Sequence, residues 1–213
     1  MKRTVSLAVL TTVCVSLALT AASAASAAPK DGGLLGGLLG SNCPTSGTQV
    51  FARWNDGNLY YLGPNGGFEN GSNGWSLSGS YVGSGNQPFT ASGSHSLVLP
   101  SGSKATSPVI CLGPKNVALR MFGSDTGGTD SGLHVRVLWY GLLNMLLGSS
   151  DYNTFAPGSG WSPTSSVKST GGINVLLPLL GSTSARVQLT PIGSGSNWRI
   201  DDFYIDPWAS ICC

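Results

Sequence analysis

Hydrophobic and polar residues alternate along several short segments of this chain. The clearest segment is 133–140. One face carries Leu133, Val135, Val137 and Trp139, and the other carries His134, Arg136, Leu138 and Tyr140. Because side chains of a strand point alternately to opposite faces, a period of two indicates a half-buried β-strand.

Shorter segments of the same kind recur along the chain and are separated by turn signals. We expect strands at 96–99, 117–122, 185–189 and 198–205. Each is followed by a proline or glycine, at Pro100, Gly123, Pro191 and Pro207. Many short strands with frequent turns predict an all-β fold, a two-sheet antiparallel β-sandwich of the jelly-roll type.

Two nearly continuous apolar runs, 142–147 and 173–180, do not alternate. They fit either buried strands or single helical turns that close one end of the sandwich. Pro178 lacks the N–H group that an interior strand position needs, so it excludes such a position within the second run.

The first residues have the three-part layout of a secretory signal peptide. Lys2 and Arg3 precede a mostly apolar run, and 25–27 supplies small residues for cleavage. The apolar run is short for a membrane span, which needs roughly 20 residues, so an N-terminal anchor is the less favoured alternative. We therefore expect a signal peptide at 1–27, a flexible Gly/Leu-rich linker at 28–49 and a β-sandwich domain at 50–213. The protein would be secreted to the extracellular space, with no membrane span.

Four cysteines remain after that segment: Cys43, Cys111, Cys212 and Cys213. An even number of cysteines in an exported chain indicates disulfides. We favour a bridge between Cys43 and Cys111, because it would fix the leader to the sandwich. Cys212 and Cys213 would form a strained ring with each other, or else bond to another chain.

The charge of the chain argues against a nucleic-acid partner. Charged residues make up only 9% of the sequence, and the net charge is +2. A nucleic-acid-binding domain carries a clustered basic face. The longest basic cluster here is the one at the start of the expected signal peptide. We expect no nucleic-acid partner.

Catalysis is not expected either, and we predict that the protein is not an enzyme. A glycosidase needs two carboxyl groups that face each other across the scissile bond. The only glutamate is Glu69, and Asp201 and Asp202 are adjacent on an expected strand, so they would point to opposite faces. No Gly-x-Ser-x-Gly elbow occurs. A serine paired with His95 or His134 would have to be assembled by the fold.

Three motifs resemble one family of folds. They are Asn65-Gly66-Gly67-Phe68-Glu69-Asn70-Gly71 followed by Trp75, then Ser94-His95-Ser96-Leu97, and Ile200-Asp201-Asp202-Phe203. Together they resemble the galactose-binding-domain-like β-jelly-rolls, which include several carbohydrate-binding module families. The closest likeness is to exported bacterial members of unassigned function. The resemblance spans 51–207, and implies that the first motif is an opening strand beside the closing strand at 198–205.

In binding modules of that kind, a Glu of the opening motif and an Asp of the closing motif often hold a structural Ca²⁺. The resemblance therefore implies Glu69 and Asp202 as ligands, with Asp201 as a substitute. Such a hard cation takes about six to eight oxygen ligands. The alternative is that these carboxylates accept hydrogen bonds from backbone N–H groups.

A sugar site needs an exposed aromatic ring with polar groups around it. By their positions, Trp75, Trp139, Trp198 and Phe203 are expected in the core. The favoured binding surface is a concave-face cluster of Arg120, His134, Arg136 and Tyr140. Trp161 and Tyr81, both expected in loops, are the second choice. The alternative is that the arginines only solvate a sheet face.

Two functions remain open. The first is a non-catalytic exported module that binds a polysaccharide or cell-envelope glycan, which predicts an exposed aromatic residue on the concave face or in the loops. The second is a structural or adhesion protein of the cell envelope or matrix with no small-molecule ligand. It predicts a closed concave face and intermolecular bonding through Cys212 or Cys213.

Overall fold

The computed structural model describes residues 44–90, 93–111, 117–128, 130–141, 144–155, 158–169 and 184–209. All of them belong to the second of two units into which the chain divides, Met1–Asp31 and Gly32–Cys213. The expected signal peptide, most of the expected linker and the run at 173–180 lie outside the described residues. So do Cys43, Cys212, Cys213 and the side chain of Cys111, and the disulfides stay predictions. Within the described ranges, no helix has the length and apolar character to cross a membrane.

The described residues form a series of strands and the short 3-10 helix η1. The elements are η1 (Ala52–Trp54), β1 (Tyr61–Leu62), β2 (Ser76–Ser78), β3 (Tyr81–Ser84), β4 (His95–Leu99), β5 (Lys104–Thr106), β6 (Ile110–Cys111), β7 (Val117–Asp125), β8 (Gly132–Tyr140), β9 (Leu146–Thr154), β10 (Ser162–Pro163), β11 (Val167–Ser169), β12 (Ser184–Ile192) and β13 (Trp198–Asp206).

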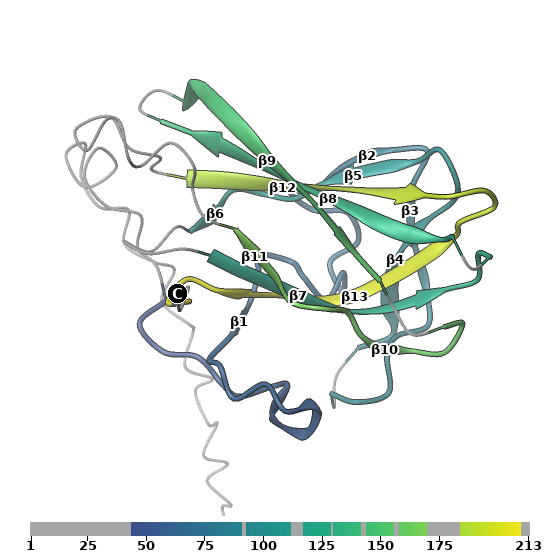
Figure 1. Ribbon diagram of the computed structural model, residues 1–213, viewed down its shortest axis with the longest axis horizontal. Coiled ribbons are helices and arrows are strands. Elements are labelled where there is room, and N and C mark those ends of the chain that lie inside the picture. The colour runs from purple at the N-terminus through teal and green to yellow at the C-terminus, as the bar shows by residue number, and fades with distance from the viewer. Residues whose placement is uncertain are drawn as a thin grey trace, which may run out of the picture. The chain divides into compact units, whose positions relative to one another are not determined.

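These strands form two antiparallel sheets that face each other as a sandwich (Figure 1). The seven-stranded sheet has the order β10-β7-β13-β4-β3, with β1 beside β13 and β11 beside β7. The six-stranded sheet has the order β2-β5-β12-β8-β9, with β6 beside β12. The expected all-β, two-sheet antiparallel β-sandwich is confirmed.

The alternating segments build the core between the two sheets. The apolar faces of β8 and β12 are fully or almost fully buried, and the four aromatic residues expected in the core, Trp75, Trp139, Trp198 and Phe203, are buried with them. β12 continues through Pro191, where the sequence predicted an end. Since β5 pairs only with Gln188 and Leu189, β12 has a free edge at Pro191, and the missing N–H group costs little there.

The apolar run at 142–147 does not fill the core where it is described. Asn144 has a left-handed backbone (φ 57°), and Met145 and Leu146 after it are exposed. Leu146 begins β9, a nine-residue edge strand that pairs with β8. The expectation of a buried strand is therefore wrong for this part of the run, because Met145 and Leu146 are exposed where the run joins two strands of a hairpin. The alternative, a single helical turn, fits Asn144, which lies in a 3-10 helical turn.

The motif at 65–75 lies beside β13, as the resemblance implies, but it forms consecutive turns rather than an opening strand. The Phe203 N–H donates to Gly66 O at 3.0 Å, and the Gly63 N–H donates to Phe203 O at 2.8 Å. A Cβ atom on Gly66 would lie 2.7 Å from Phe203 O. Left-handed backbone at Asn65 and Phe68 makes the turns, so a strand cannot form here.

A segment ahead of β1, residues 48–60, lies on the outer face of the seven-stranded sheet (Figure 1, purple to blue). We call it the N-terminal arm. Its Phe51 and Tyr60 are fully buried, and the Phe51 ring centroid lies 5.2 Å from that of Phe122 and 5.5 Å from that of Tyr204. Because the two sheet residues point outward from β7 and β13, the arm closes this part of the face with a second, aromatic core.

Candidate functional site

The expected cluster of Arg120, His134, Arg136 and Tyr140 does not exist. Arg120 is in β7 of the seven-stranded sheet, whereas the other three residues are in β8 of the six-stranded sheet. The chain crosses from one sheet to the other between these two strands. The prediction that the four residues share one face is wrong, because strands that follow each other in sequence were taken as neighbours in one sheet.

Arg120 holds the N-terminal arm in place. Its Nη1 lies 2.7 Å from Asp56 Oδ2, and its Nε donates to Thr164 O at 2.8 Å. The guanidinium also stacks 4.6 Å from the Phe51 ring centroid. Burial alone would raise the pKa of Asp56, but hydrogen bonds from Tyr60, Asn58 and Arg120 lower it overall. Only 11% of each side chain of the ion pair is exposed, so Arg120 serves packing here.

His134 and Arg136 lie on the outer face of the six-stranded sheet and share one carboxylate. Arg136 Nε donates to Asp151 Oδ1 at 2.6 Å, and His134 Nε2 lies 3.0 Å from the same oxygen. The hydrogen bond from Arg136 is the main cause of the lowered pKa of Asp151. This arrangement agrees with the alternative interpretation, in which the arginine solvates a sheet face.

The adjacency of Asp201 and Asp202 predicted that their side chains point to opposite faces of the strand. This prediction is wrong. Asp202 has a left-handed backbone (φ 47°), and the pairing of β13 with β7 shifts register between Asp201 and Tyr204. In this β-bulge both carboxylates contact Gln87. The backbone N–H of Gln87 donates to Asp201 Oδ2 at 3.1 Å, and its side-chain amide donates to Asp202 Oδ2 at 2.8 Å.

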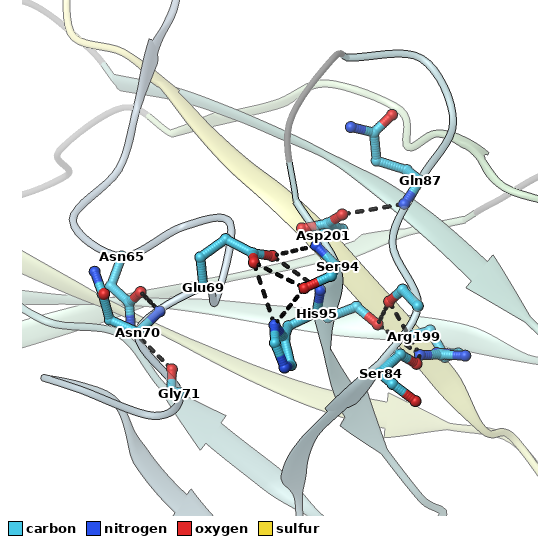
Figure 2. Close-up of polar contacts among 12 residues, drawn as sticks. Asn65, Glu69, Asn70, Gly71, Ser84, Gln87, Ser94, His95, Arg199 and Asp201 are labelled. Carbon is cyan, nitrogen blue, oxygen red and sulfur yellow. Dashed lines mark hydrogen bonds and ion pairs between the residues drawn. The ribbon is translucent and has the colours of Figure 1, made fainter.

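Glu69 lies near this pair and accepts hydrogen bonds from the start of β4. The backbone N–H groups of Ser94 and His95 each donate to Glu69 Oε1 at 2.8 Å (Figure 2). Desolvation alone would raise the pKa of Glu69, but these bonds lower it to about 2. For Glu69 the structure therefore contains the backbone contacts that the sequence analysis gave as the alternative to calcium.

The buried pair is electrostatically unfavourable as it stands. Burial raises the pKa of Asp201 to about 7, and the charges of Asp202 and Glu69 act in the same direction. Burial also raises the pKa of Asp202. A cation would offset this repulsion. In the part of the chain that is described, however, no three His, Cys, Asp or Glu side chains are grouped to hold a metal, so Ca²⁺ would need backbone carbonyls for most of its ligands. Calcium at Glu69, Asp202 and Asp201 stays a prediction.

The fold also brings Ser94, His95 and Glu69 together, a contact that the sequence analysis did not predict (Figure 2). Ser94 Oγ lies 2.9 Å from His95 Nδ1, and Glu69 Oε2 lies 3.2 Å from that same nitrogen. In a catalytic relay the hydroxyl and the carboxylate contact different ring nitrogens. These three residues therefore do not form such a relay.

The second-choice residues, Tyr81 and Trp161, lie on either side of Arg199. Tyr81 belongs to β3 rather than to a loop, and 56% of its surface is exposed. It lines a cleft of about 280 Å³ together with Gly83, Ser84, Val98 and Arg199. The Arg199 guanidinium lies 5.9 Å from the Trp161 ring centroid. The outer face of the seven-stranded sheet thus carries an arginine with an aromatic residue on each side.

Arg199 is held in place by its Nη2 atom. Nη2 donates to Ser84 O, to Gly85 O at 3.1 Å and to Ser96 Oγ at 2.8 Å (Figure 2). Among the described residues, Nη1 has no hydrogen-bond partner, so it is a donor available to a ligand. Arg199 was not among the site residues expected from the sequence. The signal was its position in the closing strand, between buried Trp198 and Ile200, which turns its side chain outward.

No protein-family model and no curated protein matches this sequence. The solved structures that it resembles include carbohydrate-binding modules, the class of protein that the sequence motifs resemble. TmCBM61, solved with β-1,4-galactotriose, is 16% identical over 66% of this chain and 94% of its own, with a TM-score of 0.43. The CBM22-1 xylan-binding domain from Paenibacillus barcinonensis is 13% identical over 77% of this chain and 97% of its own, with a TM-score of 0.44.

A third similar structure is the enzymatically active domain of tailspike protein 4 from bacteriophage CBA120. It is 15% identical over 67% of this chain, with a TM-score of 0.48, and the match spans only 20% of the tailspike chain. Since all three TM-scores are below 0.5, the function proposed below rests on the residues of this chain.

Proposed function

We propose that this protein is a non-catalytic, exported β-sandwich module that binds carbohydrate, a polysaccharide or cell-envelope glycan, at the cleft between Tyr81 and Arg199. The single observation that supports it most is the exposed Tyr81 ring beside an arginine with a free donor. Sugars present apolar C–H faces that stack on aromatic rings and hydroxyl groups that need polar partners. The cleft offers both kinds of contact.

The cleft is also pre-organised. Arg199 is fixed by three acceptors through Nη2, and the Tyr81 ring packs over Gly83, where an added Cβ would lie 3.4 Å from the ring. Side chains that are already fixed lose little entropy when a ligand binds, which favours affinity. The cleft is open to solvent rather than enclosed, which suits an extended sugar chain.

The test is a titration of the mature protein with two probe oligosaccharides, xylohexaose and β-1,4-galactotriose, followed by binding to plant, fungal and bacterial polysaccharides. Tyr81→Ala should weaken binding about tenfold or more, since a stacked ring that contributes ~1.4 kcal/mol corresponds to a factor of ten in Kd. Tyr140→Ala, which removes an aromatic ring from the outer face of the other sheet, is the matched control and should bind normally. Normal binding by Tyr81→Ala would refute this site.

A second candidate function, a structural or adhesion protein, is favoured by one observation. The N-terminal arm covers the part of the seven-stranded sheet where Phe122 and Tyr204 point outward. The feature expected for this class was a closed concave face, and the arm closes part of one outer face. If none of the probes or polysaccharides binds, and non-reducing gels show multimers through Cys212 or Cys213, this second function replaces the first.

A further inference from the structure

A second cleft lies at the opposite end of β13. Arg199 is the second residue of this strand and Asp206 is its last. At about 3.3 Å per residue, the two positions are roughly 20 Å apart. Between them, the N-terminal arm covers Tyr204. The outer face of the seven-stranded sheet thus has two separate hollows with a closed aromatic layer between them.

The second cleft has a volume of about 420 Å³, and Asn58, Leu59, Lys168, Asp206 and Trp208 line it. Lys168 of β11 and Asp206 of β13 lie on either side of β7, because both pair with Ala118. No salt bridge joins them among the described residues. A cationic donor and an anionic acceptor therefore face the same space without neutralising each other.

Both acceptors in this cleft have a free oxygen. Asp206 is only 2% exposed, and its Oδ1 accepts the Trp208 N–H at 2.8 Å. Within the described ranges its Oδ2 has no hydrogen bond. Asn58 donates its side-chain amide to Asp56 Oδ1 at 2.8 Å, which leaves its carbonyl oxygen for a ligand. A buried carboxylate with an unused oxygen is costly unless a donor reaches it.

Trp208 supplies a supported aromatic ring. A Cβ atom on Gly47 would lie 2.9 Å from Cζ3 of the indole, so the glycine backbone packs against the ring and holds it. The ring is only partly buried and lines the cleft. A ring that is held from behind can stack on a ligand with little loss of entropy.

We propose that this cleft is a second carbohydrate site, in which Trp208 stacks on a sugar face, Asp206 and Asn58 accept from its hydroxyl groups, and Lys168 donates. One positive and one negative side chain line the cleft, so its net charge is zero and it fits a neutral sugar better than an acidic one. This inference rests on the proposed function. With two sites on one sheet, the module is bivalent and joins two glycan segments, which increases avidity without new contacts.

The test is calorimetric titration with xylohexaose and β-1,4-galactotriose, read as the number of oligosaccharides bound per chain. The wild-type protein should bind about two, and Tyr81→Ala and Trp208→Ala should each bind about one. Tyr140→Ala, distant from both clefts, should bind about two. Lys168→Met, a change at an exposed residue, should weaken the second site at least threefold and keeps the test valid if Trp208→Ala fails to fold.

The two proposals fail in different ways. A wild-type stoichiometry of about one, lost in Tyr81→Ala and unchanged in Lys168→Met, would overturn the second site and leave the proposed function intact. Binding that is weakened in Lys168→Met and lost in Trp208→Ala but unchanged in Tyr81→Ala would overturn the first site and keep the second. If neither oligosaccharide produces heat of binding, both proposed sites are overturned.

Discussion

The ion pair between Arg120 and Asp56 provides the sharpest test of how the N-terminal arm is held. Replacing Arg120 with alanine removes the 2.7 Å contact to Asp56, the hydrogen bond to Thr164 O and the stacking on Phe51. It also leaves Asp56, which is 11% exposed, without its cation. Removing one partner of a buried pair typically costs about 3 to 5 kcal/mol, and this pair lies at the lower end because some solvent reaches it.

We therefore expect Arg120→Ala to lower the free energy of unfolding by about 3 kcal/mol. For a domain of this size, that is a fall in Tm of roughly 6 to 12 °C. Chemical denaturation followed by tryptophan fluorescence measures the loss. A double-mutant cycle with Asp56→Ala separates the pair from the other contacts of Arg120.

The chain contains a matched control. Arg136 contacts Asp151 at 2.6 Å, almost the same distance, but these side chains are 42% and 44% exposed. Because exposed ion pairs contribute less than about 1 kcal/mol, Arg136→Ala should change stability little. If the two variants lose the same free energy of unfolding, Arg120 does not hold a buried arm and is an ordinary solvated surface arginine.

Two further predictions concern the motifs at 65–75 and 200–203. Gly66→Ala should lower the free energy of unfolding, measured by chemical denaturation, by at least about 2 kcal/mol, because its Cβ would lie 2.7 Å from the backbone oxygen of Phe203. Gly160→Ala, which has open space around it, should change that free energy by no more than about 0.5 kcal/mol. An unchanged stability in Gly66→Ala would contradict the contact. For Asp201, the pKa of about 7 in the folded protein lies above the ordinary value of 3.8, so the stability that this carboxyl contributes is complete below pH 4 and is lost as the pH rises through about 7. Without metal, the protein should be less stable at pH 8 than at pH 5 by roughly 2 to 4 kcal/mol; Asp201→Asn should flatten this dependence, and Ca²⁺ should restore stability at pH 8 if it binds there. A melting temperature that is the same with calcium and with a chelator would show that calcium does not bind at this site.

The sequence predicted the parts of the fold in which local pattern and burial agree. β8 was clear because its inward residues are large and apolar, and its outward residues are mostly polar. β9 was missed because its Gly-Ser-Ser-Asp stretch lies at a sheet edge, where few residues need to be apolar. Pattern alone also cannot tell which sheet receives a strand, and this caused the error that grouped Arg120 with His134.

The candidate site was predicted only in part for the same reason. Tyr81 was selected by residue type, but its partner Arg199 depends on pairing between β3, β4 and β13, which no local window contains. The positions of Asp201 and Asp202 depend on one left-handed residue in a strand, and the alternation rule assumes that no such residue occurs. The sequence did not predict the arm, because its Phe51 contacts Phe122 and Tyr204, which are distant in the sequence.

The arm also determines how the domain would respond to a pull on the chain ahead of it. Thr48 and Tyr60 exchange two backbone hydrogen bonds of 2.9 Å, and Tyr60 directly precedes β1 on β13. Tension on the N-terminal side is therefore borne first by these bonds and the rings behind them, and only afterwards by the long ladder between β7 and β13. Such a segment would yield before the sandwich does. The second cleft, which includes Asn58 and Leu59 of the arm, would then open, whereas the cleft at Tyr81 and Arg199 contains no arm residue and would keep its shape.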